Sequence, residues 1–174
     1  MQEYYKKSLN SFISETEHLP RKHVLSIMED LLRAVHYLHS IGIFHRDIKL
    51  DNIMLRKEGD AYRPVLIDFG MADRIGNANL LFPKCGTPGY VPPEVFTEGA
   101  RDPKGDIFSL GVIFHVLLFK SPVFAGSSKE ELMFNNRSGK MALDQTKLES
   151  ENPLIRDLLL RMLAVNKKDR LSAS

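Results

Sequence analysis

The stretch HRDIKLDN at residues 45–52, followed by DFG at residues 68–70, carries most of the information in this chain. Transfer of a phosphoryl group from a nucleotide to a hydroxyl requires an aspartate that accepts the hydroxyl proton. It also requires an asparagine and a second aspartate, whose oxygens hold magnesium ions against the triphosphate. Asp47, Asn52 and Asp68 are these residue types in this order, so the sequence predicts phosphoryl transfer.

Around these motifs the chain resembles the eukaryotic protein kinase family, from residue 3 to residue 170. GTPGY at residues 86–90 resembles the family's substrate-facing loop. PPE at residues 92–94 stands where the family has Ala-Pro-Glu, with Pro92 in place of the usual alanine. Lys49, two residues after Asp47, resembles the serine/threonine branch. The resemblance implies a kinase that uses ATP and Mg²⁺ and acts on a protein Ser or Thr hydroxyl.

The resemblance extends over the large lobe of the family only. No GxGxxG loop precedes residue 45, because the first glycine is Gly42, and no strand of the VAIK type is present. Residues 2–5 resemble the hinge, and residues 8–13 resemble the helix that follows it. We therefore expect a mainly helical α+β fold without the small lobe, forming one partial kinase domain over residues 1–174. Without the elements that orient the triphosphate, this chain by itself should be a weak or inactive enzyme.

The family resemblance also assigns roles to single residues. Asp47 and Lys49 are the expected catalytic residues: Asp47 accepts the proton, and Lys49 neutralises charge on the transferring group. Asn52 and Asp68 are the expected magnesium ligands. The other assignments are to ATP (Glu3, Tyr5 and Met54), to the peptide substrate (Thr87 and Asp51), and to structural support of the site by packing or ion pairing (His45, Arg46, Phe69, Gly70, Glu94, Asp106 and Arg170).

Several of these residues have an ordinary structural alternative. Met54 lies in an apolar stretch and suits a plain core position as well as the floor of an adenine site. Thr87 could be a simple turn residue before Pro88. His36 and His39 share a helix face, but surface histidines are common and we do not interpret them as a metal site. Asn136-Arg137-Ser138 matches a glycosylation sequon, which we interpret as a polar loop.

Composition restricts the classes of partner. The chain has 174 residues, of which 43% are hydrophobic and 26% charged, which is ordinary for a globular domain. Its 24 basic and 22 acidic residues give a net charge of +2, too small to predict binding to nucleic acid or a membrane. Cys85 is the single cysteine and no signal peptide is evident, so we expect a cytoplasmic or nuclear protein.

Apolar spacing predicts the local structure. Residues 21–40 repeat at three- and four-residue intervals, which indicates an amphipathic helix ended by Gly42. Short strands are expected at residues 43–44, 53–55 and 65–67, the last two joined by a hairpin at residues 57–60. Residues 107–119 predict a central buried helix. A last helix, capped by Asn152 and Pro153, should present one apolar stripe formed by Leu154, Ile155, Leu158, Leu159, Met162 and Leu163.

Residues 76–90 lack periodicity, as an activation loop should. Residues 71–86 contain no Ser, Thr or Tyr, so the loop cannot be phosphorylated upstream of Thr87. In many kinases the arginine before the catalytic aspartate binds a loop phosphate. Here Arg46 needs another partner. We expect regulation by a binding partner, by the supply of the protein or by its localisation.

Two other functions remain open. A noncatalytic, pseudokinase-like module would recruit peptides or another kinase, and the apolar surface that a small lobe would cover invites such a partner. A small-molecule phosphotransferase would share Asp47 and the magnesium ligands but would usually lack GTPGY and PPE. The intact set of polar site residues favours the enzyme over the module.

Overall fold

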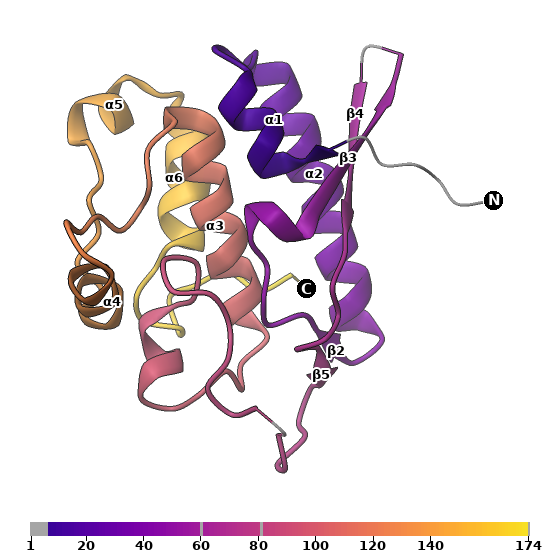
Figure 1. Ribbon diagram of the computed structural model, residues 1–174, viewed down its shortest axis with the longest axis vertical. Helices are drawn as coiled ribbons and strands as arrows, with labels where there is room; N and C mark the ends of the chain where they lie inside the picture. Colours follow the sequence, from indigo (N-terminus) through magenta and orange to yellow (C-terminus); the bar gives the residue numbers. More distant parts are fainter. Residues whose placement is uncertain (1–6, 60, 81, 174) are drawn as a thin grey trace.

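A computed structural model describes residues 7–59, 61–80 and 82–173 (Figure 1). The expected hinge contacts Glu3 and Tyr5 lie outside the described residues. Within the described part, the fold is the expected mainly helical α+β arrangement with a few short strands. None of the described helices combines the length and apolarity needed to cross a bilayer.

The core is built on two long helices. Helix α2 (Arg21–Ser40) has the predicted bounds, and its buried face is formed by Val24, Ile27, Met28, Leu31 and Val35. Helix α3 (Lys104–Phe119) is buried on nearly every side, as its continuous apolar sequence predicts. Helix α6 (Pro153–Met162) packs closely on α3, since a Cβ at Gly111 would lie 3.0 Å from the Cβ of Met162. Glycine therefore permits this approach.

The strands form two small sheets. Strands β1 (Lys7–Ser8), β3 (Ile53–Glu58) and β4 (Ala61–Leu66) form an antiparallel sheet in the order β1-β3-β4, which lies against α2 (Figure 1). The predicted hairpin is confirmed, but its turn is shorter than expected, because Lys57 and Glu58 belong to β3. Strand β4 begins four residues earlier than expected and ends at Leu66, one residue before the expected end. Strand β2 (Ile43–Phe44), also predicted, pairs with β5 (Asp73–Arg74).

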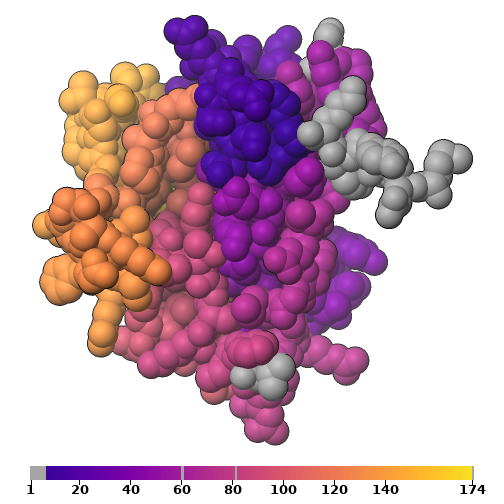
Figure 2. Space-filling model, in the orientation of Figure 1, coloured from indigo at the N-terminus to yellow at the C-terminus, as the bar shows by residue number. Residues whose placement is uncertain are grey.

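Shorter elements surround this core. Helix α1 (Leu9–Glu15) begins after Ser8, whose hydroxyl caps it, and helices α4 (Lys129–Ser138) and α5 (Gln145–Ser150) lie on the other side of α3 from α1 (Figure 1). Single 3₁₀ turns occur at Leu50–Asn52 and Pro93–Phe96. In the space-filling view the magenta and pink segments cover the lower part of the molecule, and α4 lies at its left edge (Figure 2).

One predicted feature of the last helix is wrong. Asn152 caps α6 as expected, its side chain accepting a hydrogen bond from the Leu154 N–H at 2.9 Å. Leu159, Met162 and Leu163 are buried, but Leu154 is 81% exposed. Leu154 is the second residue of α6, in its first turn, whereas Ile155, Leu158 and Leu159 pack into the core. The buried stripe accordingly begins after Leu154.

Candidate active site

The catalytic loop, residues 45–52, is held by one buried carboxylate. Asp106, at the start of α3, is 2% exposed. Its two oxygens accept hydrogen bonds from the backbone N–H groups of His45 at 2.8 Å and Arg46 at 2.9 Å. His39 Nε2 lies 2.9 Å from the same carboxylate. Arg46 has a φ of 73°, a conformation unusual outside glycine, and these bonds stabilise it.

Asp47 lies at the centre of a polar cluster. Lys49 Nζ donates to its Oδ2 at 2.8 Å, and Thr87 Oγ1 donates to its Oδ1 at 2.7 Å. Lys49 Nζ also lies 3.1 Å from Thr87 Oγ1. The Asn52 amide donates to the Asp47 carbonyl at 2.9 Å and to its Oδ2 at 3.0 Å. Residues 38 to 40 positions apart in sequence thus meet at one carboxylate.

Asp68 reaches the same region from the end of β4. The Ile67 N–H donates to the Asn52 carbonyl at 2.9 Å, which fixes the chain next to Asn52 just before Asp68. Asp68 itself has a φ of 63°, is exposed, and accepts a bond from the Gly70 N–H at 3.2 Å. Because the Asn52 Nδ2 is committed to Asp47, its Oδ1 is the atom available for a cation. An amide oxygen and a carboxylate fit magnesium, which prefers hard oxygen ligands.

His45 and Phe69 support these residues by packing. Their ring centroids are 4.8 Å apart, and His45 Nε2 lies 3.1 Å from the Ile67 carbonyl. His45 is fully buried, whereas Phe69 is 47% exposed. Met54, in β3, is half-buried opposite Ser8 of β1. The nucleotide role expected of Met54 stays a prediction.

Arg46 finds its partners within the chain. Its Nε and Nη2 donate to Cys85 Sγ at 3.1 and 2.7 Å, and its Nη1 lies 3.4 Å from Asp73 Oδ2. Nη2 also donates to the Phe82 carbonyl. Burial raises the pKa of the Cys85 thiol, and the adjacent Arg46 opposes this only in part. The guanidinium is therefore satisfied without a loop phosphate.

The substrate-facing loop, residues 86–90, is shaped by close packing. Gly86 has a φ of 106°, and a Cβ there would lie 2.9 Å from the Arg46 carbonyl, so only glycine fits. The Tyr90 carbonyl accepts a hydrogen bond from Ser109 Oγ of α3 at 3.0 Å. Burial, with a smaller effect from Asp51, raises the pKa of Tyr90. The loop is thus fixed against both the catalytic loop and α3.

Asp51, the other expected peptide contact, is exposed at the edge of the site. Its carboxylate accepts a hydrogen bond from Asn10 Nδ2 of α1 at 2.8 Å. Asp51 is therefore held by α1, whereas Thr87 bonds to Asp47.

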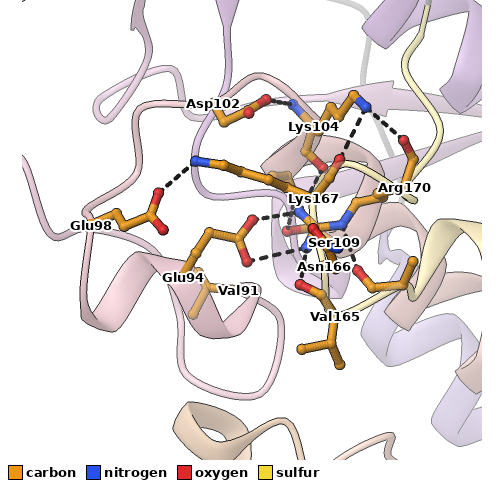
Figure 3. Close-up of polar contacts among 12 residues, drawn as sticks. Val91, Glu94, Glu98, Asp102, Lys104, Ser109, Val165, Asn166, Lys167 and Arg170 are labelled. Atoms are coloured by element: carbon orange, nitrogen blue, oxygen red, sulfur yellow. Dashed lines mark hydrogen bonds and ion pairs between the residues drawn. The ribbon is translucent and has the colours of Figure 1, made fainter.

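The ion pair expected between Glu94 and Arg170 is present (Figure 3). The guanidinium donates in a bidentate manner, with Nη1–Oε1 and Nη2–Oε2 distances of 2.6 and 3.1 Å. It also donates to the carbonyls of Ala164 and Val165 at 2.9 and 3.2 Å and lies over the Phe108 ring. Arg170 is buried, so this pair ties the segment after the substrate-facing loop to the helical core.

Sequence reasoning missed several residues of this site. Asp73, Phe82 and Cys85 surround Arg46, but they lie 27 to 39 residues from it and share no spacing with it. Asn136 of α4 contacts the substrate-facing loop. The available signal for Asn136 was indirect: α4 has no apolar stripe, so a polar residue must face the molecule.

Comparisons with known proteins agree with this geometry. A family model described as protein kinase domain matches residues 1–174. A probable serine/threonine-protein kinase 2 from Plasmodium falciparum is 33% identical over 165 residues, which is 95% of this chain and 31% of that protein. Myosin light chain kinase A of Dictyostelium discoideum is 30% identical over 86% of this chain and 50% of its own length.

A calcium/calmodulin-dependent protein kinase type II from Caenorhabditis elegans is 31% identical over 84% of this chain and 20% of its own length. The chain thus spans between a fifth and a half of these relatives. The family model matches all of its residues, and Lys49 and Thr87, from two separate motifs, both bond to Asp47. The chain belongs to the protein kinase family.

Proposed function

We propose that this protein transfers the γ-phosphoryl group of ATP to a Ser or Thr hydroxyl of a protein substrate. The observation that carries the proposal is the Asp47 carboxylate, which is held by Lys49, Thr87 and Asn52 at 2.7–3.0 Å. A carboxylate fixed in this way can accept a hydroxyl proton without reorganising. The serine/threonine-kinase names of similar proteins support the choice of acceptor.

Each residue near Asp47 has a separate task in this proposal. Lys49 carries positive charge beside the acceptor site and stabilises negative charge that develops during transfer. Asn52 and Asp68 would hold Mg²⁺, which neutralises the triphosphate when bound. Thr87 orients both Asp47 and Lys49 from the peptide side, so the acceptor and its proton-accepting group are positioned together.

The contacts with ATP and with partners are also proposals. Glu3, Tyr5 and Met54 are proposed to line the adenine site, and Asp51 to contact the peptide. We propose a cytoplasmic or nuclear location, as expected from the composition. A partner that covers the exposed Phe69 and its surroundings would add to the site, and without one we expect weak transfer by this chain alone.

We further infer that the activation loop works without a phosphate. The Arg46 guanidinium already contacts the carboxylate of Asp73, the carbonyl of Phe82 and the thiol of Cys85. A phosphate would have to displace these groups. Mass spectrometry that finds a phosphate required for activity on Thr87 would contradict this inference.

The test is magnesium-dependent transfer of labelled phosphate from ATP to degenerate Ser/Thr peptides by the intact protein, with a Tyr library beside it. Asp47→Asn should reduce the transfer rate by about 10²- to 10⁴-fold, the usual contribution of a positioned acid-base group. Asp157→Asn, at an exposed aspartate of α6, is the matched control and should leave the rate unchanged. Equal rates for both variants, or no transfer by the folded wild type, would favour the noncatalytic binding module.

A further inference from the structure

Helix α4 is attached to the molecule in an unusual way. Of its residues, all of which the structure describes, Asn136 alone is fully buried, with 0% exposure. Met133 and Phe134 on the same helix are exposed. A surface helix normally buries an apolar stripe, whereas a buried amide must satisfy its hydrogen bonds inside the protein. The burial of a polar residue therefore indicates a specific partner.

That partner is the backbone of the substrate-facing loop and the residue after it. Asn136 Oδ1 accepts a hydrogen bond from the Gly89 N–H at 2.8 Å, and Asn136 Nδ2 donates to the Val91 carbonyl at 2.8 Å. The amide thus holds the backbone on both sides of Tyr90. Leu132, one turn earlier on the same helix face, packs at Gly89: a Cβ built there would lie 3.8 Å from its Cδ2.

Helix α4 is itself fixed at both ends, so Asn136 projects from a rigid element. Ser128 caps the first turn, and Glu131 accepts bonds from the backbone N–H and the hydroxyl of Ser127 at 2.7 and 2.6 Å. Gly139 ends the helix in the left-handed conformation, with a φ of 69°. A shift of the Asn136 amide would therefore require a shift of the whole helix.

The clamped backbone leads directly to the proposed acceptor site. The Thr87 carbonyl accepts bonds from the N–H groups of Tyr90 at 3.0 Å and Val91 at 3.3 Å, which closes a turn. Thr87 Oγ1 bonds to Asp47 from the same turn. Movement of Gly89 or Val91, which Asn136 holds, would therefore displace the Thr87 hydroxyl from Asp47.

We propose that Asn136 is a positioning residue for the peptide substrate, which sets the conformation of the substrate-facing loop from α4. This proposal rests on the proposed kinase function. The interpretation of Asn136 as a polar loop residue is wrong, because Asn136 lies in helix α4, its amide is buried and both of its polar side-chain atoms are hydrogen-bonded.

The test compares Asn136→Leu with Asn135→Leu in the intact protein. Asn135 is the neighbouring residue of α4, and its amide donates to the Ala125 carbonyl rather than to the loop. Leucine has a similar volume but no amide, so Asn136→Leu leaves Gly89 N–H and the Val91 carbonyl without their partner. We expect the peptide KM to rise about tenfold, the effect of losing hydrogen bonds of ordinary strength, with the ATP KM unchanged. Hydrogen exchange at the Gly89 N–H, which loses its acceptor, should accelerate, and Asn135→Leu should change neither the peptide KM nor this exchange rate.

Two further outcomes are decisive. A peptide KM for Asn136→Leu that matches the Asn135→Leu value, or an equal rise in the ATP KM, would overturn the positioning role. If Asn136→Leu does not fold, Asn136→Asp replaces it, since it keeps the acceptor for Gly89 but loses the donor to Val91. If the wild type transfers no phosphate, the proposed function fails, and the exchange rate of the Gly89 N–H in Asn136→Leu alone decides this inference: an unchanged rate overturns it.

Discussion

The catalytic loop and the substrate-facing loop are each positioned by a buried polar side chain, which comes from a different helix in each case. In the catalytic loop, the Asp106 carboxylate binds the N–H groups of His45 and Arg46, and Asp106 belongs to the buried helix α3. In the substrate-facing loop, the neutral amide of Asn136 binds the backbone around Tyr90, and Asn136 belongs to the peripheral helix α4. In both cases a buried polar side chain replaces the hydrogen-bond ladder that the loop lacks.

This difference separates two kinds of rigidity. The catalytic loop is fixed to the core and can shift only if α3 does, because α3 is buried on nearly every side. The position of the substrate-facing loop depends on α4. The segment that follows this loop is held by the ion pair of Glu94 with Arg170. Substitutions that affect the substrate-facing loop should therefore alter peptide binding more than they alter the chemistry at Asp47.

The largest effect is expected at the ion pair that fixes the substrate side. Arg170→Ala leaves Glu94 without its partner and frees the carbonyls of Ala164 and Val165. Breaking a buried pair from one side costs about 3–5 kcal/mol, so the free energy of unfolding should fall by that amount in urea titrations. Arg161→Ala removes an exposed pair with Asp157 and should change it by less than about 1 kcal/mol. Similar values for both variants would show that Glu94 is not held by this pair.

The anchor of the catalytic loop should be the next most sensitive. Asp106→Asn keeps the shape of the side chain but places an amide NH₂ group against the N–H of His45 or Arg46. One buried donor then lacks a partner, which costs about 1–3 kcal/mol in urea titrations. Asp144→Asn, at the N-cap of α5, should be neutral because asparagine caps helices equally well. If Asp106→Asn left the free energy of unfolding unchanged, the charge of the Asp106 side chain would not be needed to hold the catalytic loop.

A smaller effect, on activity rather than on folding, is expected where the two loops meet. Thr87→Val removes the hydroxyl that bonds Asp47 and Lys49 while keeping the shape of the side chain. Phosphate transfer should fall by about 10- to 150-fold, since hydrogen bonds to charged groups contribute about 1.5–3 kcal/mol, with little change in Tm. Thr87→Ser keeps the hydroxyl and should retain most of the activity. Full activity in Thr87→Val would mean that the loops act independently.

The smallest effect concerns the other end of α3. Burial lowers the pKa of His115, whose Nδ1 lies 3.0 Å from the Ser121 carbonyl. The unfolded chain then binds more protons than the folded protein near the usual histidine pKa, so the contribution to stability is present above about pH 6.5 and is lost as pH falls below it. His115→Gln should reduce the slope of unfolding free energy between about pH 5 and pH 7. If His115→Gln left the slope of unfolding free energy against pH unchanged, the loss of stability at low pH would come from groups nearer the two loops.

The local structure followed from the sequence wherever one face of an element is buried. The bounds of α2 were predicted because its apolar residues recur at helical spacing, and the β3–β4 hairpin because two apolar runs flank a turn. The same reasoning failed at Leu154, where adjacent leucines hid the edge of the buried face. A run of apolar residues identifies a helix but does not show where its contact with the core begins.

Within the candidate site, the residue types of the motifs and the pairing of Glu94 with Arg170 were predictable, whereas the partners of Arg46 were not. Asp47, Lys49 and Asn52 are close in sequence, so their spacing already placed them on one loop. The requirement for a partner of Arg46 was also foreseen, but its identity was not, because Asp73, Phe82 and Cys85 lie in segments without periodicity. Asn136 was interpreted as a polar loop residue, since exposed and buried asparagines have the same appearance in a sequence.

The sequence by itself determined the family, the helical core and the set of residues proposed for phosphoryl transfer, because these depend on residue type and on short, regular spacing. Only the tertiary structure decided which distant groups meet in the site: the N–H groups of His45 and Arg46 that bind Asp106, Cys85 beside Arg46, and Asn136 next to the substrate-facing loop. The physical reason is that loops without regular structure have no backbone hydrogen-bond ladder of their own. Their backbone groups are satisfied by side chains whose position depends on how the whole chain packs.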